Sequence, residues 1–230
     1  YTLVDADYSQ IELRVLAHIA NDETMINAFE KDIDIHTQTA SQVFGVPLEL
    51  VTAEMRTRAK AVNFGIVYGI GDYSLSQDLG ITRSEAKQYI ESYLSTYGGV
   101  KQYMADIIEK GKTDGYVTTL LGRRRYLTEL KAPDFVTRSY GERIALNTPI
   151  QGSAADIIKI AMVKVHKRLN DENMKSRLVL QVHDELIVEA HVSEVETVKQ
   201  IVKYEMENAL ALKVLLKVDI NTGRTWYDAK

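Results

Sequence analysis

Two β-strand patterns, one near each end of the 230-residue chain, constrain the fold more than any other feature of the sequence. The first run, residues 2–7, ends at Asp7 and gives way to a helical pattern near Ser9. The second, residues 178–189, has apolar β-branched stretches on both sides of His183-Asp184-Glu185, which is typical of a hairpin with acids at its tip. If the two runs are neighbours in one sheet, Asp7 and Asp184 meet at one edge of it.

Two carboxylates at one sheet edge favour a divalent-metal site. Carboxylate oxygens are hard ligands, and two ions about 3.5 to 4 Å apart can clamp the attacking and leaving oxygens of a phosphoryl transfer. The alternative is that these acids only form turns or face solvent. We interpret Asp7 and Asp184 as ligands for phosphoryl chemistry.

Composition sets wider bounds. A chain of 230 residues suits one large domain or two small ones, and the absence of cysteine excludes disulfides and zinc-thiolate sites. We find no signal peptide and no apolar run near the roughly 18 residues of a spanning helix, so we expect a soluble, cytoplasmic protein without a membrane partner. The net charge of -4 argues against a simple basic nucleic-acid-binding module, although cations cluster at 56–60 and at 123–125.

The hydrophobic periodicity predicts an α+β fold, with helices grouped around a small antiparallel sheet. Expected helices are 9–20, 23–30, 35–44, 53–68, 82–97, one that ends near 112, 138–147, 153–169 and 193–210; expected strands are 2–7, hairpins at 115–126 and 178–189, and 215–221. Thr52 is a plausible N-cap, and Thr82 with Glu85 has capping-box spacing. Pro149 and Gly152 should interrupt the helical pattern between 147 and 153.

The helix expected over 53–68 carries four residues at a spacing of four: Arg56, Lys60, Phe64 and Tyr68. They form one stripe about 18 Å long at 1.5 Å rise per residue. The two cations could hold a triphosphate, and the aromatic rings beyond them could pack against a sugar and base. The alternative is an ordinary amphipathic helix, with its cations in water and its rings in the core.

Taken together, the motifs resemble those of family A DNA polymerases of bacteria. The three polymerase motifs stand in order as Asp7-Tyr-Ser-Gln-Ile-Glu-Leu-Arg14, Arg56-x-x-x-Lys60-x-x-x-Phe64-Gly-x-x-Tyr68-Gly69 and Gln181-Val-His-Asp-Glu185. Further matches are Thr118-Thr-Leu-Leu-Gly-Arg-Arg-Arg-Tyr126, Arg143-x-x-x-Asn147-x-Pro-Ile-Gln151-Gly-Ser-Ala-Ala-Asp156 and Thr225-Trp-Tyr-Asp-Ala-Lys230. The resemblance covers essentially the whole chain and implies a DNA-directed DNA polymerase, a nucleotidyltransferase of replication and repair.

The resemblance assigns roles around the metal and the triphosphate. It implies two Mg²⁺ ions, replaceable by Mn²⁺, held by Asp7, Asp184 and the carbonyl of Tyr8, with Glu185 as an auxiliary acid. The residues expected around the nucleotide are Gln10, Glu12, His36, Arg56, Lys60, Phe64 and Tyr68. Lys60 is also expected to protonate the leaving pyrophosphate. His36 alone would more often be an ordinary surface or helix-packing histidine, so its role rests on the family.

Two of these residues imply substrate selectivity. Glu12 is expected to occupy the space of a ribose 2′-hydroxyl, braced by Tyr68, which implies deoxynucleoside triphosphates as substrates. Phe64 resembles the form of the family that discriminates against dideoxynucleotides. Phe64 and Tyr68 would form the wall on which the nascent base pair is checked.

The resemblance also implies contacts with primer-template DNA. Arg143, Asn147 and Gln151 match residues that read the minor groove, and His183 would lie near the primer terminus. Arg123 to Arg125 either approach DNA phosphates or form a solvated turn. Asp5 shares a strand face with Asp7 and could tune the metal site electrostatically, but we expect it to sit farther down the strand, solvated or paired, and not to be a ligand.

The family architecture implies a palm at 1–30 and 131–230 with mostly helical fingers at 31–130 inserted between the catalytic strands. Because the chain opens almost directly on the first catalytic strand, we expect a C-terminal fragment without the thumb, monomeric and associated with the bacterial nucleoid. Two alternatives stay open. One is a fragment that binds nucleotide or primer-template but is inactive without the missing thumb and palm segments, and the other is an unrelated two-metal nuclease or phosphatase.

Overall fold

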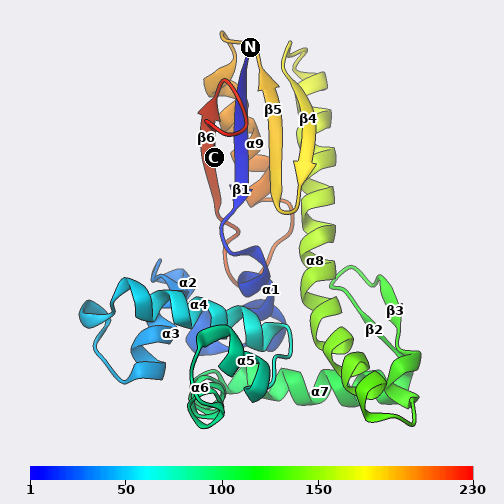
Figure 1. The fold of residues 1–230 in the computed structure, drawn as a ribbon. Helices are drawn as coiled ribbons and strands as arrows, with labels where there is room; N and C mark the ends of the chain where they lie inside the picture. The colour runs from blue at the N-terminus through cyan, green and yellow to red at the C-terminus, as the bar shows by residue number, and fades with distance from the viewer. Residues whose placement is uncertain (230) are drawn as a thin grey trace. The chain divides into compact units, whose positions relative to one another are not determined.

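The computed structural model describes residues 1–229, which form two compact units. Unit 1 combines Tyr1–Val15 with the described part of Ser153–Lys230, and unit 2 is Leu16–Gly152 (Figure 1). Lys230, the last residue of the C-terminal motif, lies outside the described residues. The assignment of palm and fingers to 1–30, 31–130 and 131–230 stays a prediction.

Unit 1 contains a four-stranded antiparallel sheet with the strand order β4-β5-β1-β6. Its strands are β1 (Thr2–Tyr8), β4 (Arg177–Val182), β5 (Glu185–Ala190) and β6 (Val218–Gly223). The first strand of the chain therefore lies between two strands from its C-terminal part, as Figure 1 shows. The predicted α+β class with a small antiparallel sheet is confirmed.

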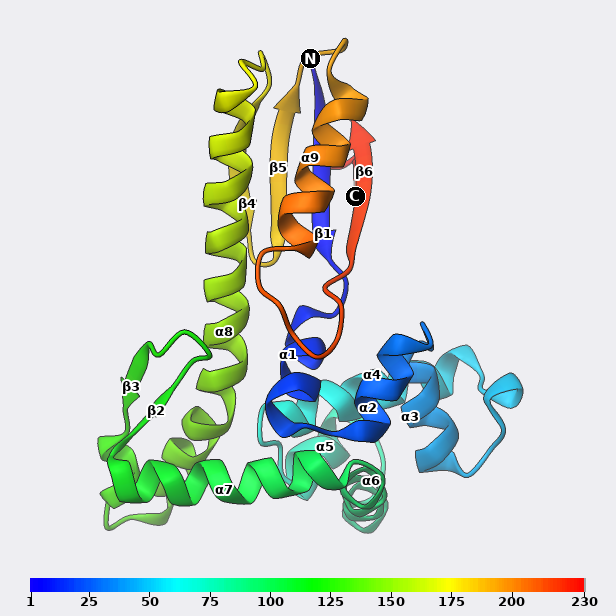
Figure 2. The same cartoon turned by 180° about the vertical axis from the view of Figure 1, so that it is seen from behind.

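Helix α9 (Val195–Glu207) packs against one face of this sheet, where Figure 2 shows it in front of β1. Val4, Ala6 and Tyr8 alternate along β1 and are all buried. The hydroxyl of Tyr8 donates a 2.6 Å hydrogen bond to the carbonyl of Met206 in α9. This bond fixes the end of β1 that carries Asp7 against the helix.

A buried arginine holds the turn after β1. Arg14 is 6% exposed, and its guanidinium donates to the carbonyls of Ser9 and Leu215, each at 2.7 Å. Arg14 lies in α1 (Ile11–Ala20), so it joins the turn that carries Gln10 to the segment that leads into β6. These charge-assisted hydrogen bonds give the buried guanidinium of Arg14 partners that water does not supply.

Unit 2 is mostly helical. Its elements are α2 (Glu23–Glu30), α3 (Ile35–Phe44), α4 (Ala53–Val67), α5 (Asp72–Leu79), α6 (Arg83–Thr96), α7 (Gly98–Asp114), β2 (Tyr116–Thr118), β3 (Arg124–Tyr126) and short 3₁₀ turns at Leu48–Leu50 and Thr128–Lys131. Helix α5 was not expected. It has only eight residues, with Gly71 and Gly80 as its caps. Two glycines this close together favour a loop when only the sequence is considered.

Capping side chains define several helix ends in unit 2. Thr52 accepts a hydrogen bond from the backbone N–H of Met55, and Thr82 and Glu85 form the predicted capping box. Asp22 caps α2 and also accepts bonds from the N–H groups of Gly99 and Val100 at 2.9 and 3.3 Å. One buried carboxylate therefore joins the N-termini of α2 and α7, where negative charge is favourable.

The prediction that Pro149 and Gly152 interrupt the helix is wrong. Helix α8 runs from Phe135 to Asp171 through both residues. Pro149 removes the N–H that would bond the carbonyl of Ala145, and the Tyr103 hydroxyl donates at 3.1 Å to the next carbonyl along the helix, that of Leu146. A Cβ at Gly152 would lie 2.6 Å from Thr119 Cγ2, so this glycine allows the β2–β3 hairpin to approach α8 closely.

Among the helices of residues 1–229, none combines the length and the apolar character needed to cross a membrane.

Candidate active site

The two predicted metal-binding aspartates lie at the same end of the unit 1 sheet. Strand β1 pairs with β5 in a register that sets Asp7 opposite Glu185. The backbone N–H of Tyr8 donates to the carbonyl of Asp184 at 3.2 Å. The hypothesis that the two acid-bearing strands are neighbours is therefore confirmed, while metal binding by Asp7, Tyr8 and Asp184 stays a prediction.

Two predicted site residues adopt backbone angles that are uncommon for residues other than glycine. His183, in the turn between β4 and β5, has φ +49°, and Gln10, between β1 and α1, has φ +56°. The side chain of Gln181 donates a 2.6 Å bond to the carbonyl of His183 and holds the turn. Such backbone strain persists only where the surroundings enforce it, and it is frequent at functional sites.

A third acid, Asp219 of β6, faces Asp7 from the other side of β1. Glu185, Asp7 and Asp219 thus occupy one row across three strands. The sequence did not identify Asp219, because the register of β6 cannot be read from a strand pattern alone. Like charges in one cross-strand row repel one another, so a bound cation would lower the energy of this end of the sheet.

The expectation that Asp5 is solvated is wrong. Its side chain is only 4% exposed, so it is not solvated, and it lies in register with Ile187 and Asn221, farther from the turn than Asp7. Asp7 itself is exposed and can reach a ligand in solution.

The donor set at the sheet end fits Mg²⁺. Asp7, Asp184 and the carbonyl of Tyr8 supply hard oxygen ligands, which this ion prefers. Within residues 1–229, no group of three or more acidic or histidine side chains is arranged to enclose a metal ion. Mg²⁺ commonly binds through one or two carboxylates, with substrate phosphates and water as its other ligands. The arrangement suits an ion that arrives with a phosphate-bearing substrate.

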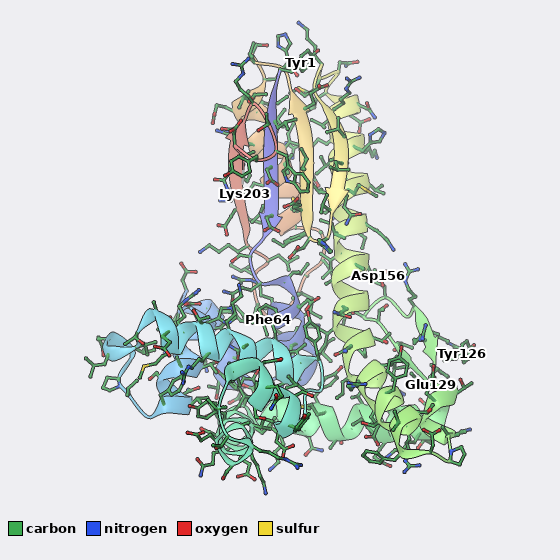
Figure 3. All side chains as sticks on the ribbon, in the orientation of Figure 1. Tyr1, Phe64, Tyr126, Glu129, Asp156 and Lys203 are labelled. Carbon is green, nitrogen blue, oxygen red and sulfur yellow. The ribbon has the colours of Figure 1, made fainter. Side chains whose placement is uncertain are left out.

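In unit 2, helix α4 carries the basic-aromatic row as one continuous helix, and Tyr68 is its C-cap residue. Arg56 and Lys60 are exposed, and the rings of Phe64 and Tyr68 stack at 6.3 Å with 23° between their planes. The buried side of α4 consists of Ala59, Val62, Asn63, Ile66 and Val67. Phe64 and Tyr68 are not among these buried residues (Figure 3 labels Phe64). The basic-aromatic row is therefore not the core face of an ordinary amphipathic helix.

Asp34 and His36, at the start of α3, face the basic end of this row. Asp34 accepts a 2.5 Å hydrogen bond from Nε of Arg56. Partial burial opposes ionisation, but bonds from Arg56, Thr37 and the N–H of His36 outweigh it and hold the pKa of Asp34 at about 2. Burial, with Arg56 and Lys60 nearby, lowers the pKa of His36 to about 4, although Asp34 acts in the opposite direction. Asp34 is therefore ionised and His36 neutral at pH 7.

The predicted duplex-contacting residues, Arg143, Asn147 and Gln151, all lie in α8. Asn147 and Gln151 line an open pocket of about 470 Å³, together with Arg125, Tyr140, Ile144, Thr148 and Gly152. Oδ1 of Asn147 is buried and has no hydrogen-bond partner within the described part of the chain. An acceptor left in this state is suited to a ligand that donates a hydrogen bond.

The end of α4 lies against the part of α8 that carries Arg143. Gly69 has φ +70°, and a Cβ at this position would lie 3.1 Å from Cγ of Arg143 and from Cδ1 of Leu146. Unit 2 thus brings the aromatic end of the α4 row next to the first of the predicted duplex contacts.

The predicted site residues therefore form two sets, one in each unit. Unit 1 holds Asp7, Tyr8, Gln10, Glu12, His183, Asp184 and Glu185, and unit 2 holds His36, Arg56, Lys60, Phe64, Tyr68, Arg143, Asn147 and Gln151. The family model of DNA polymerase family A matches residues 1–228. The chain belongs to this family.

Relatives in this family are similar to the whole chain. DNA polymerase I of Bacillus subtilis is 60% identical over 225 residues, which are 98% of this chain and 26% of that protein. DNA polymerase I of Caldicellulosiruptor bescii is 54% identical over 230 residues, 100% of this chain and 27% of that protein. The chain thus spans about a quarter of the length of these relatives.

A solved structure shares the fold. It is the POL domain of Pol1 from M. smegmatis, in complex with a DNA primer-template and dNTP, with a TM-score of 0.96 and 46% sequence identity. The match covers 100% of this chain and 40% of the solved chain.

Proposed function

We propose that this chain is the catalytic segment of a DNA-templated DNA polymerase, which adds deoxynucleoside triphosphates to a primer 3′-hydroxyl. The observation that carries the proposal is the β1–β5 register, which brings Asp7 and Asp184 to one sheet end in a family A chain. The Mycobacterium structure, with its primer-template and dNTP, supports the choice of substrates.

Asp7, Asp184 and the carbonyl of Tyr8 would hold two Mg²⁺ ions, and Mn²⁺ could replace them. When bound, such ions lower the pKa of an attacking hydroxyl and neutralise a leaving pyrophosphate. Glu185, opposite Asp7 and 4% exposed, would act on the electrostatics of the pair and not as a ligand. His183, in the β4–β5 turn, would lie beside the primer terminus.

The basic end of α4 would bind the triphosphate. Arg56 and Lys60 lie one helical turn apart and are exposed, so both can reach phosphate oxygens. Lys60 would also act as the proton donor to the departing pyrophosphate. Gln10, in its left-handed turn, would add a hydrogen bond, and His36 would add another as a neutral group.

The aromatic end of α4 would test the new base pair. The stacked rings of Phe64 and Tyr68 give a flat surface on which a pair of correct shape packs well. Glu12, in the first turn of α1, would exclude a 2′-hydroxyl and so select deoxyribose. The pocket along α8, with Asn147 and Gln151, would contact minor-groove atoms of the primer-template, together with Arg143.

We propose a monomer that works on nucleoid DNA in the bacterial cytoplasm, in replication and repair. An inactive binding fragment is the second candidate, and the observation that favours it is that the chain spans only 26–27% of the polymerases it matches.

Primer extension with Mg²⁺ and four deoxynucleotides tests the proposal, performed with this chain and with a longer polypeptide that includes preceding residues. Extension by both supports the polymerase segment, and extension by only the longer one supports the dependent fragment. Degradation of DNA without nucleotides would instead identify a nuclease.

A matched pair of variants sharpens the test. Asp184→Ala should lower extension by orders of magnitude and leave primer-template binding intact, because the lost group holds the metal and not the DNA. Asp78→Ala, which removes an exposed acid of α5, is the control and should extend normally. Normal extension by Asp184→Ala would refute the assignment.

A further inference from the structure

A chain of four buried polar side chains runs inward from the nucleotide row of unit 2. Nδ1 of His36 lies 2.9 Å from Nδ2 of Asn63 in α4. Oδ1 of Asn63 accepts a 3.0 Å bond from the Thr39 hydroxyl, and Oγ1 of Thr39 lies 3.1 Å from the hydroxyl of Tyr97. Thr39, Asn63 and Tyr97 are 0% exposed and His36 is 2% exposed, so water does not compete for these groups.

Counting hydroxyl protons fixes the direction of this chain. If Tyr97 donates to Thr39, Thr39 donates to Asn63 Oδ1, and Asn63 Nδ2 donates to His36, then each hydroxyl proton has an acceptor. In the reverse direction Thr39 would donate to Tyr97, whose own proton would have no acceptor among the described residues. A buried donor without a partner costs about 1 to 3 kcal/mol, so the first direction is favoured.

The direction determines the state of the His36 ring. A nitrogen that accepts a hydrogen bond carries no proton, so Nδ1 is bare and the proton of the neutral ring is on Nε2. The charged groups that face the ring are Asp34 at the start of α3, and Arg56 and Lys60 on α4. The two cations and the burial oppose a second proton and hold the pKa of His36 at about 4.

We propose that Asn63, supported by Thr39 and Tyr97, is a positioning residue that holds His36 as the neutral Nε2–H tautomer, so that the ring gives the substrate triphosphate a hydrogen bond. The role of the triphosphate rests on the proposed function. His36 lies beside the row, with its ring centroid 5.7 Å from that of Phe64. Arg56 and Lys60 supply the charge, and His36 supplies a donor of fixed direction whose strength does not vary near neutral pH.

The tautomer can be measured without substrate. In the NMR spectrum of the full polypeptide labelled with ¹⁵N-histidine, the five histidines should give five pairs of ring-nitrogen signals. The pair that is missing from the spectrum of His36→Gln belongs to His36. We expect its Nδ1 to resonate as an unprotonated nitrogen and Nε2 as a protonated one, from pH 8 to about pH 5. A protonated Nδ1 in this pH range overturns the proposal, whatever the outcome of nucleotide binding.

One variant and a matched control test the hydrogen bonds from Tyr97 to His36. Asn63→Asp replaces the donor to Nδ1 by a carboxylate, so the proton should move to Nδ1 and the pKa of His36 should rise. Thr39→Ser keeps the hydroxyl and should retain the tautomer of the original protein, which makes it the matched control. If Asn63→Asp does not fold, Thr39→Val, which removes the hydroxyl that orients Asn63, should give a mixture of both tautomers.

Binding of a deoxynucleoside triphosphate, measured by titration in primer-template complex at several pH values, links the tautomer to function. We expect a Kd that is flat between pH 6 and 8 in the original protein and in Thr39→Ser. In Asn63→Asp we expect Kd to be about tenfold higher at pH 8 and to depend on pH. Unchanged affinity and pH profile in Asn63→Asp would mean that the hydrogen bonds among Tyr97, Thr39, Asn63 and His36 serve only the fold, and this would overturn the proposal. Absence of binding in the original protein would refute the proposed function, while the spectrum still reports the tautomer.

Discussion

Acidification should destabilise unit 2 through His36. The ordinary pKa of 6.5 falls to about 4 in the folded protein, mainly because the ring is buried. Between these values the unfolded chain binds more protons than the folded one, so the stability present above pH 6.5 is lost as the pH falls toward 4. The difference corresponds to about 3 kcal/mol in total, and about 2 kcal/mol of it is lost by pH 5. Asp34, with a pKa of about 2, stays ionised throughout this range.

Urea unfolding at pH 7.5 and 5.0, followed by circular dichroism of the helices, measures this loss. The comparison is with His36→Gln, which cannot titrate, so the pH-dependent difference between the two proteins isolates His36. For a slope of about 2 kcal/mol per molar urea, the midpoint of the original protein should fall by about 1 M more than that of the variant. His166→Gln, at an exposed site, is the control and should behave as the original protein does.

Fluorescence provides an internal check. Trp226 is the single tryptophan and lies in unit 1, so its signal reports a part of the protein without His36. Equal pH dependence of the circular-dichroism midpoint in the original protein and in His36→Gln would refute the reasoning, because a buried neutral histidine lowers stability when the solution can protonate the unfolded chain.

Three further substitutions test other parts of the molecule. Phe64→Tyr should relax discrimination against dideoxynucleotides in primer extension, and unchanged selectivity would contradict the resemblance on which this rests. Glu12→Ala should raise ribonucleotide incorporation roughly tenfold, a change of about 1.4 kcal/mol, and an unaltered ratio would remove the main support for deoxyribose selection. Tyr8→Phe should lower the free energy of unfolding by about 1 to 3 kcal/mol, because the Met206 carbonyl loses a buried donor, and Tyr204→Phe at an exposed site should change it little.

Local patterns predicted most of the elements correctly. The N-cap at Thr52 and the capping box of Thr82 and Glu85 were found because their bonds join residues three apart in sequence. The prediction failed where a distant group mattered. Proline at 149 and glycine at 152 read as a break, but Tyr103 satisfies a carbonyl near the proline, and Thr119 requires the glycine.

The candidate site shows the same division. The spacing of Arg56, Lys60, Phe64 and Tyr68 made their shared row predictable, since helical geometry repeats locally. Asp219 escaped notice because its place beside Asp7 depends on the register of β6, and nothing in the strand pattern states the partner of a residue. The buried chain of Tyr97, Thr39 and Asn63 was invisible for a similar reason, because the three residues come from separate helices or their ends.

The sequence by itself determined the α+β class, the family and the identity of the residues expected to bind metal, nucleotide and DNA, because motif spacing and hydrophobic period are properties of neighbours along the chain. Only the tertiary structure decided that Asp7 stands between Glu185 and Asp219, that α8 is one helix, and that Nδ1 of His36 lies within hydrogen-bond distance of the Asn63 side chain. These outcomes depend on register and on buried hydrogen bonds between distant segments, and such pairings exist only after the chain has folded.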